Sequence, residues 1–135
     1  MEEAAIMNTL YVCENNLVKS QIAYALHWNH FGGRNVDSAG VNVDGQEGAH
    51  VSNDLCEIMK EVGVEINGQR AKQLTEYMVS SASRVIVLCP KEICPKYLTG
   101  ARDADVIYWN ISDLISHEME ELRKTRDEII KYFSS

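Results

Sequence analysis

The sequence predicts an α/β fold, a three-layer αβα sandwich around a central four-stranded parallel sheet. Short apolar runs of strand length alternate with segments of helical period, which is the pattern of successive βαβ units. The run at 84–88 is entirely apolar after its first residue, as expected of a strand covered on both faces. A chain of 135 residues suits one compact domain, expected over residues 1–135.

The first half of the chain alternates strand, helix and strand. An apolar strand is expected at 10–12, and apolar residues at helical spacing predict a helix over 20–29. The turn at Gly32-Gly33 leads into a second strand at 35–39. A site is expected at the C-terminal ends of these strands, where right-handed crossovers leave a crevice in such sheets.

The second half supplies two more strands and two more helices. Apolar residues at i, i+3, i+4 and i+7 predict a helix over 55–62, which Gly63 ends. Strands are expected at 84–88 and 105–109. The final helix is expected over 116–133, where a stripe of apolar residues again follows the helical period.

Composition excludes several classes of function. Thirteen basic against twenty acidic residues give a net charge of −7, which argues against a nucleic-acid surface. No apolar run approaches the roughly 20 residues that cross a bilayer, so no membrane partner is expected. The acidic start, Met-Glu-Glu-Ala-Ala, lacks the positively charged and then apolar stretches of a signal peptide. We therefore expect a cytoplasmic protein.

The four cysteines are expected to be free. In a reducing cytosol, thiols are more often catalytic, redox-active or simply buried than paired in structural disulfides. The sequence has no Cys-x2-Cys pair and no finger-like arrangement of histidines, so neither a metal nor another cofactor is expected. Cys56 lies beside the apolar face of its helix and is expected to belong to the core.

Residues 9–20 hold the most informative pattern. An apolar strand ends at Cys13, five residues follow, and Lys19 and Ser20 open a helix. The free N–H groups of a helix N-terminus bind tetrahedral oxyanions and favour a thiolate. The spacing therefore predicts a loop that holds a phosphate-like group above a nucleophilic sulfur.

Four segments carry a resemblance to a known family. Residues 12–23, VCENNLVKSQIA, are similar to the V-C-x-x-N-x-C-R-S-x-x-A of low-molecular-weight protein tyrosine phosphatases and the thioredoxin-coupled arsenate reductases that share their fold. Residues 38–40 match the family's S-A-G, and residues 59–66 resemble its M-K-E-x-G-I-D-I. Residues 109–113 have the spacing of its tryptophan-to-aspartate segment. The resemblance covers nearly the whole chain.

The resemblance implies a role for each site residue. Cys13 would be the nucleophile, Ser20 would help hold it as a thiolate, and Asp113 would be the general acid. Asn16 would brace the loop. The phosphate would be bound by the Lys19 side chain and by the main-chain N–H groups of Glu14, Asn15, Asn16, Leu17, Val18 and Lys19.

Several departures from the family, three of them in the loops of the site, predict an altered or weakened site. Lys19 stands where the family has arginine, so it keeps one charge but loses the planar fork that holds two oxygens. Val18 replaces a second loop cysteine, which removes a local disulfide partner for Cys13. Leu114 replaces the proline after the acid, which leaves that loop less rigid.

Cys89 and Cys94 support a competing hypothesis. They resemble the two redox cysteines of the reductases, although the segment between them is shorter here. In that chemistry Cys13 attacks arsenate, Cys89 resolves the adduct, and Cys94 exchanges with Cys89 before a thioredoxin-like reductant restores the thiols.

Three functions from two classes therefore remain open. The first is a phosphatase that acts on a phosphotyrosine-like monoester, carried by a small molecule or a phosphoprotein, through a phosphocysteine. The second is the arsenate reductase, and the third is a phosphatase-like protein that binds an anion or a partner without turnover.

Simpler interpretations of single residues also remain open. Cys13 could be only a buried thiol, Asp113 could cap the last helix, and Cys89 could pack as a small apolar side chain. Tyr97 and Tyr108 are candidates for the rim of the pocket.

Overall fold

Four parallel strands form the central sheet. The computed structural model describes residues 8–66, 69–101 and 105–133. The sheet has the order β2-β1-β3-β4, and every neighbouring pair is parallel. The strands are β1 (Thr9–Cys13), β2 (Val36–Gly40), β3 (Arg84–Val87) and β4 (Asp105–Tyr108).

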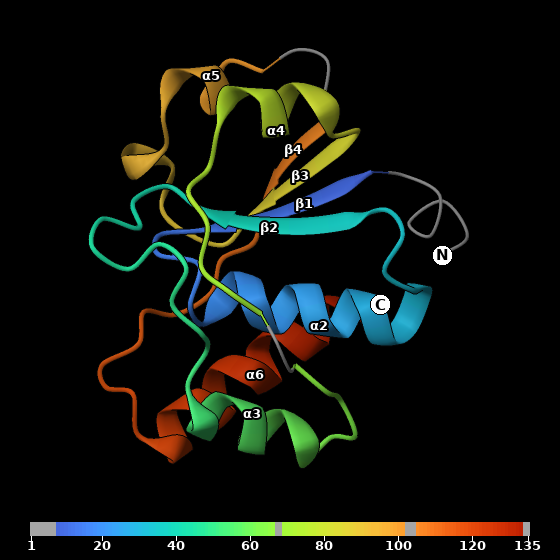
Figure 1. Cartoon of the computed structure of the whole chain (residues 1–135), viewed down its shortest axis with the longest axis vertical. Helices are drawn as coiled ribbons and strands as arrows, with labels where there is room; N and C mark the ends of the chain where they lie inside the picture. Colours follow the sequence, from blue (N-terminus) through green and yellow to red (C-terminus); the bar gives the residue numbers. More distant parts are fainter. Residues whose placement is uncertain (1–7, 67–68, 102–104, 134–135) are drawn as a thin grey trace.

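Helices cover both faces of this sheet, which confirms the predicted αβα sandwich. Figure 1 shows α2, α3 and α6 packed together on one face, and α4 and α5 on the other. The helices are α2 (Lys19–Phe31), α3 (Asn53–Lys60), α4 (Glu76–Ser81), α5 (Lys96–Thr99) and α6 (Met119–Phe133), with a 3₁₀ turn η1 at Lys91–Ile93. No helix in the described ranges is long and apolar enough to cross a membrane.

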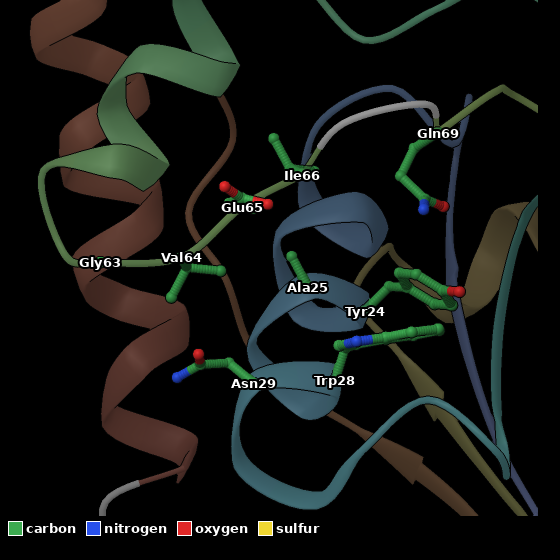
Figure 2. Close-up of a pocket in the computed structure, with 9 residues that line it drawn as sticks. All are labelled: Tyr24, Ala25, Trp28, Asn29, Gly63, Val64, Glu65, Ile66 and Gln69. Carbon is green, nitrogen blue, oxygen red and sulfur yellow. The ribbon is translucent and has the colours of Figure 1, made fainter.

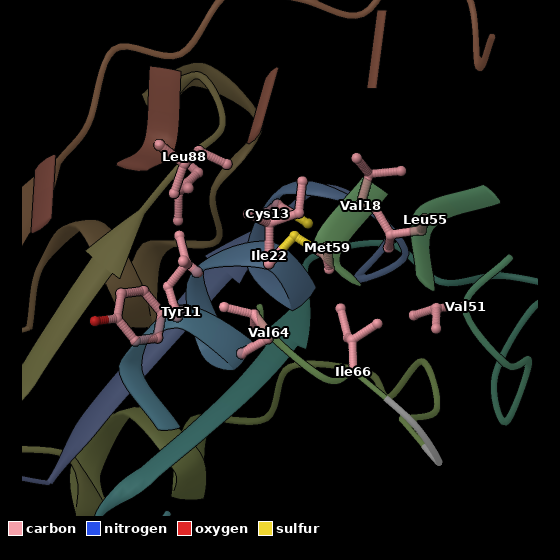
Figure 3. Packing of buried hydrophobic residues seen from close by; sticks show 14 of the residues in the cluster. Tyr11, Cys13, Val18, Ile22, Val51, Leu55, Met59, Val64, Ile66 and Leu88 are labelled. Atoms are coloured by element: carbon pink, nitrogen blue, oxygen red, sulfur yellow. The ribbon is translucent and has the colours of Figure 1, made fainter. Parts of the chain in front are cut away.

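The side chains of β1 alternate between the two faces of the sheet, and each face packs against its own buried cluster. Tyr11 and Cys13 belong to the larger buried cluster, shown in Figure 3, which also takes in apolar side chains of α2, α3 and α6. Leu10 and Val12 belong to a second cluster, which holds residues of α4 and α5. Because successive strand residues point to opposite faces, the position of Cys13 fixes its side chain on the α2 side.

The predicted elements are present, with changes at their ends. The last helix begins at Met119 rather than at residue 116, so the interpretation of Asp113 as its cap is wrong. The first helix runs on to Phe31 instead of ending at residue 29, and the other bounds shift by one or two residues. The short elements α4, η1 and α5 were not predicted, because fewer than two helical turns leave little periodicity to detect.

Candidate active site

The loop between β1 and α2 forms the floor of the candidate site. Cys13 is the last residue of β1, and α2 begins at Lys19, so residues 14–18 make the connection. The residue before the helix is Val18, whose apolar side chain supplies no cap for the first turn. Helix N–H groups without a side-chain cap remain available to an anion.

Two donors converge on the sulfur of Cys13, whose side chain is buried. The Asn16 backbone N–H donates to Sγ at 3.3 Å, and Ser20 Oγ lies 2.9 Å from Sγ. Asn16 Nδ2 also donates to Ser20 Oγ at 2.7 Å, which leaves the hydroxyl hydrogen free to point at the sulfur. The sulfur therefore has polar partners, although Cys13 also belongs to the buried apolar cluster.

Asn16 ties the loop to two other segments. Its backbone has a φ of 59°, a left-handed conformation that asparagine tolerates better than most residues. Besides its bond to Ser20, its Nδ2 donates to Ser38 Oγ at 3.1 Å, and its Oδ1 accepts from the Lys72 N–H at 3.0 Å. The side chain is fully buried, so these bonds hold the loop in place at the end of β2.

The close approach of the loop explains why the Ser-Ala-Gly segment ends in a glycine, Gly40. A Cβ atom at this position would lie 2.8 Å from both the carbonyl carbon of Asn15 and the backbone nitrogen of Asn16. The loop stays in this close position because the Val41 N–H donates to the Cys13 carbonyl at 2.9 Å. Any side chain at residue 40 would therefore push the loop away from β2.

A cavity of about 480 Å³ opens above the sulfur, and several predicted site residues line it. Lys19 has a mostly buried side chain, and its Nζ lies 3.8 Å from Asp113 Oδ1. The Asp113 carboxyl itself is 90% exposed. The described part of the cavity wall consists of Cys13, Glu14, Asn15, Val18, Lys19, Cys89, Pro90, Ile93, Asp113, Leu114 and His117.

The predicted loop residues divide into two groups. Glu14, Asn15, Val18 and Lys19 line the cavity directly. Asn16 and Ser20 are fully buried and contact the sulfur and each other. Leu17 is half-buried, and its N–H donates to the Asn15 side-chain oxygen at 3.2 Å.

Two more thiols lie beside the same cavity. Cys89 lines it, and its sulfur lies 4.0 Å from that of Cys94. Burial raises the pKa of the Cys89 thiol strongly, and charge on Cys94, Cys13 or Glu14 would raise it further. Burial also raises the pKa of Cys94. Burial therefore favours the protonated form of both thiols in this conformation.

Sequence reasoning missed some of the residues that line the cavity. His117, Pro90 and Ile93 line the cavity and are absent from the predicted site. The position of His117 four residues after the candidate acid is the one signal that could have found it. Pro90 and Ile93 belong to the short 3₁₀ turn η1 and its N-cap, just after Cys89. A turn this short leaves no periodic pattern in the sequence, so nothing marked these two residues as part of the site.

The remaining candidates lie in different places. Tyr108 lines a second cavity that adjoins the first, whereas the Tyr97 hydroxyl donates to the Leu74 carbonyl at 3.3 Å. Cys56 is half-buried and packs against the core cluster. Within the described ranges no group of three or more His, Cys, Asp or Glu side chains could hold a metal ion.

A further cavity, of about 460 Å³, lies between α2 and the segment after α3 (Figure 2). Tyr24 and Trp28 of α2 line it, together with residues 63–66 and Gln69. Its described lining contains none of the cysteines or loop residues discussed above, so it is separate from the thiol site.

Comparisons with known proteins agree with this geometry. The family described as low molecular weight phosphotyrosine protein phosphatase matches residues 8–131. An arsenate reductase of Brevibacillus brevis is 29% identical, over 88% of this chain and 85% of its own. A probable low molecular weight protein-tyrosine-phosphatase, EpsP of Ralstonia nicotianae, is 34% identical over 62% of this chain and 56% of its own.

The fold itself is shared with solved structures. Vibrio vulnificus Wzb in complex with benzylphosphonate superposes with a TM-score of 0.80 at 19% sequence identity, and the match covers 93% of each chain. At this identity the likeness establishes a common fold, and the relatives by sequence include both phosphatases and arsenate reductases.

Proposed function

Because the chain belongs to the low molecular weight phosphotyrosine protein phosphatase family, we propose that it is a cysteine-dependent phosphatase that hydrolyses a phosphomonoester through Cys13. The observation that carries this proposal is the arrangement around one cavity. The Cys13 sulfur accepts a hydrogen bond from the Asn16 N–H and lies 2.9 Å from Ser20 Oγ, and Lys19 and Asp113 face the same cavity 3.8 Å apart. A nucleophile, a cation and an acid are the groups that this hydrolysis requires.

The first step transfers the phosphoryl group to sulfur. The Cys13 thiolate attacks phosphorus, an S–P bond forms, and the bond from phosphorus to the ester oxygen breaks. Protonated Asp113 gives its proton to the leaving oxygen. The loop N–H groups and Lys19 stabilise the charge on the three equatorial oxygens.

The second step releases phosphate. Asp113, now a carboxylate, accepts a proton from a water molecule that attacks phosphorus from the side the leaving group vacated. The S–P bond breaks, the electron pair returns to the Cys13 sulfur, and inorganic phosphate departs. Ser20 supports both steps because its hydroxyl hydrogen stabilises the thiolate that attacks first and leaves second.

Lys19 makes this site different from one built on arginine. A single ammonium group binds the anion as a point charge and does not fix two oxygens in a plane. Its ion pair with Asp113 also links the anion-binding group to the acid across the empty cavity. We expect turnover, at a lower rate than an arginine would support.

A second candidate function, arsenate reduction, is favoured by the three thiols at this site. Cys13 and Cys89 line one cavity, and Cys94 lies 4.0 Å from Cys89. The Cys13 thiolate would displace water from arsenic, and Cys89 would attack the Cys13 sulfur, releasing arsenite as both electrons pass to arsenic. Cys94 would then attack Cys89 in the resulting Cys13–Cys89 disulfide, which releases the Cys13 thiolate and forms a Cys89–Cys94 disulfide. A thioredoxin-like dithiol would reduce that disulfide.

The phosphatase comes first because the relay needs two thiolates that this conformation disfavours. A thiol attacks sulfur only after it loses its proton, and burial raises the pKa of both Cys89 and Cys94. Asp113 lines the cavity with its side chain open to solvent, where a leaving group can reach it.

Two assays on the purified chain separate the hypotheses. The phosphatase predicts turnover of an aryl phosphate that Cys13→Ser abolishes and that Cys89→Ser leaves intact. The reductase predicts thiol consumption that depends on arsenate and disappears with serine at residue 13, 89 or 94. If phosphate protects the chain against unfolding while both assays stay silent, the protein binds an anion without turnover and both proposals are wrong.

A further inference from the structure

The cavity between α2 and the segment after α3 has the size and the lining of a ligand site. Its volume of about 460 Å³ falls in the range of about 300–1,000 Å³ typical of pockets for small molecules. Side chains of α2 line one part of it, and the segment that follows α3 lines another (Figure 2). None of its described lining residues borders the cavity above Cys13 or the cavity that adjoins it, so a ligand here is independent of the proposed reaction.

Trp28 offers this cavity a large aromatic surface that is fixed in position. The residue is 54% exposed. A Cβ atom at Gly33 would lie 1.8–2.2 Å from three carbons of the indole ring, so the ring lies directly against the Gly33 backbone and any side chain there would collide with it. The indole also pairs with the Tyr24 ring, whose centre is 6.0 Å away. An exposed ring that is already fixed binds a ligand with little loss of side-chain entropy.

The rest of the lining combines buried apolar side chains with neutral polar ones. Ala25, Val64 and Ile66 are each exposed by 3% or less. Covering such surfaces favours a ligand with an apolar body over an inorganic ion. Asn29 and Gln69 supply side-chain carbonyl oxygens, which accept hydrogen bonds.

Glu65 determines the charge that the ligand carries. It is the one acidic residue in the described lining, which includes no lysine, arginine or histidine. Its side chain is exposed, and no cationic group of the described residues lies within 4.0 Å of its carboxylate. A carboxylate and an indole ring both attract positive charge, as does the net charge of −7 on the chain.

We propose that this cavity binds a small organic cation, an ammonium group carried on an apolar body. The ammonium group pairs with the Glu65 carboxylate and donates to the side-chain carbonyl oxygens of Asn29 or Gln69. The body covers the Trp28 ring and the buried apolar side chains. An anion would be repelled by Glu65, so this ligand is opposite in charge to the one proposed above Cys13.

The experiment compares the 2-phenylethylammonium ion with 2-phenylethanol, an uncharged molecule of similar shape. Binding of each to the full chain is measured by calorimetric titration at neutral pH. We expect saturable binding of the ion, about tenfold tighter than binding of the alcohol, the combined effect of an exposed ion pair and a cation–π contact. Glu65→Gln should remove this preference, and Trp28→Ala should weaken binding of both molecules about tenfold, the effect of one aromatic contact.

Two matched controls lie on α4, which covers the other face of the sheet (Figure 1). Glu76→Gln removes another exposed carboxylate, and Tyr77→Ala removes another exposed aromatic ring. Neither residue lines this cavity, so both variants should leave the two affinities unchanged. Equal affinity for the ion and the alcohol would overturn the proposal, as would affinities that Glu65→Gln and Trp28→Ala leave unchanged. Absence of saturable binding of the ion would overturn it too.

Discussion

The fully buried Asn16 side chain offers the sharpest test of how the loop is held. Replacing it with alanine removes three hydrogen bonds, to Ser20 Oγ, Ser38 Oγ and the Lys72 N–H. Each bond contributes about 1 kcal/mol, and leaving buried partners unsatisfied adds to the loss. Alanine at a φ of 59° costs about 1 kcal/mol more. We therefore expect Asn16→Ala to lower the free energy of unfolding by about 3–5 kcal/mol.

Urea unfolding followed by tryptophan fluorescence measures this loss. Asn16→Gly separates its parts, because glycine adopts the left-handed conformation freely and should recover about 1 kcal/mol of it. The neighbouring Asn15 is the matched control, since its half-buried side chain accepts one hydrogen bond, from the Leu17 N–H. A loss below about 1 kcal/mol for Asn16→Ala, the worth of a single hydrogen bond, would refute the bracing role, as would an equal loss for Asn15→Ala.

Three further predictions concern the anion, the loop and the core. Lys19→Arg should raise kcat for an aryl phosphate about tenfold or more, whereas Lys19→Met should lower it by about 10²–10³, the effect of removing one donor to the developing charge. Gly40→Ala should lower both stability and turnover, because its Cβ would lie 2.8 Å from the loop backbone. His27 is buried, and burial lowers its pKa from 6.5 to about 4. Since the unfolded chain then binds the extra proton, stability should fall by about 3 kcal/mol as the pH drops from 6.5 to 4, measured by urea unfolding at several pH values.

Each of these predictions has an outcome that contradicts it. If Lys19→Arg slows the reaction, the site has been tuned to a ligand other than a phosphate monoester. Normal turnover in Gly40→Ala would mean that the loop tolerates displacement from β2. For His27, the same loss of stability between pH 6.5 and 4 in His27→Gln would assign the effect to other groups, since glutamine does not titrate.

The fold was most predictable where a strand lies in an uninterrupted apolar run. The run at 84–88 matches a strand covered on both faces, and β3 occupies most of it. The start of α6 was not predictable in the same way. Leu114 and Ile115 extend the apolar pattern of the last helix backwards, yet Ile115 is 86% exposed and lies in the loop after the acid. Periodicity alone does not separate a buried stripe from apolar residues that face solvent.

The relative placement of the candidate residues was predictable where a motif puts several of them on one short segment. Cys13, Lys19 and Ser20 lie within one strand-to-helix connection, so their spacing alone sets their relation. Contacts between distant segments left no such signal. The Lys72 N–H that binds Asn16 is a backbone group, which any residue at that position would supply. The second cavity depends on how two loops after β3 and β4 face each other, which no local pattern reveals.

The most direct test of the central claim is to trap the covalent intermediate. The protein is mixed with an aryl phosphate, quenched in acid within the first turnover, and its intact mass and peptide masses are measured. If Cys13 is the nucleophile, the protein gains one phosphoryl group, located on Cys13 and absent from Cys13→Ser. Hydrolysis of the ester that continues in Cys13→Ser, or a phosphoryl group found on any other residue, would contradict it.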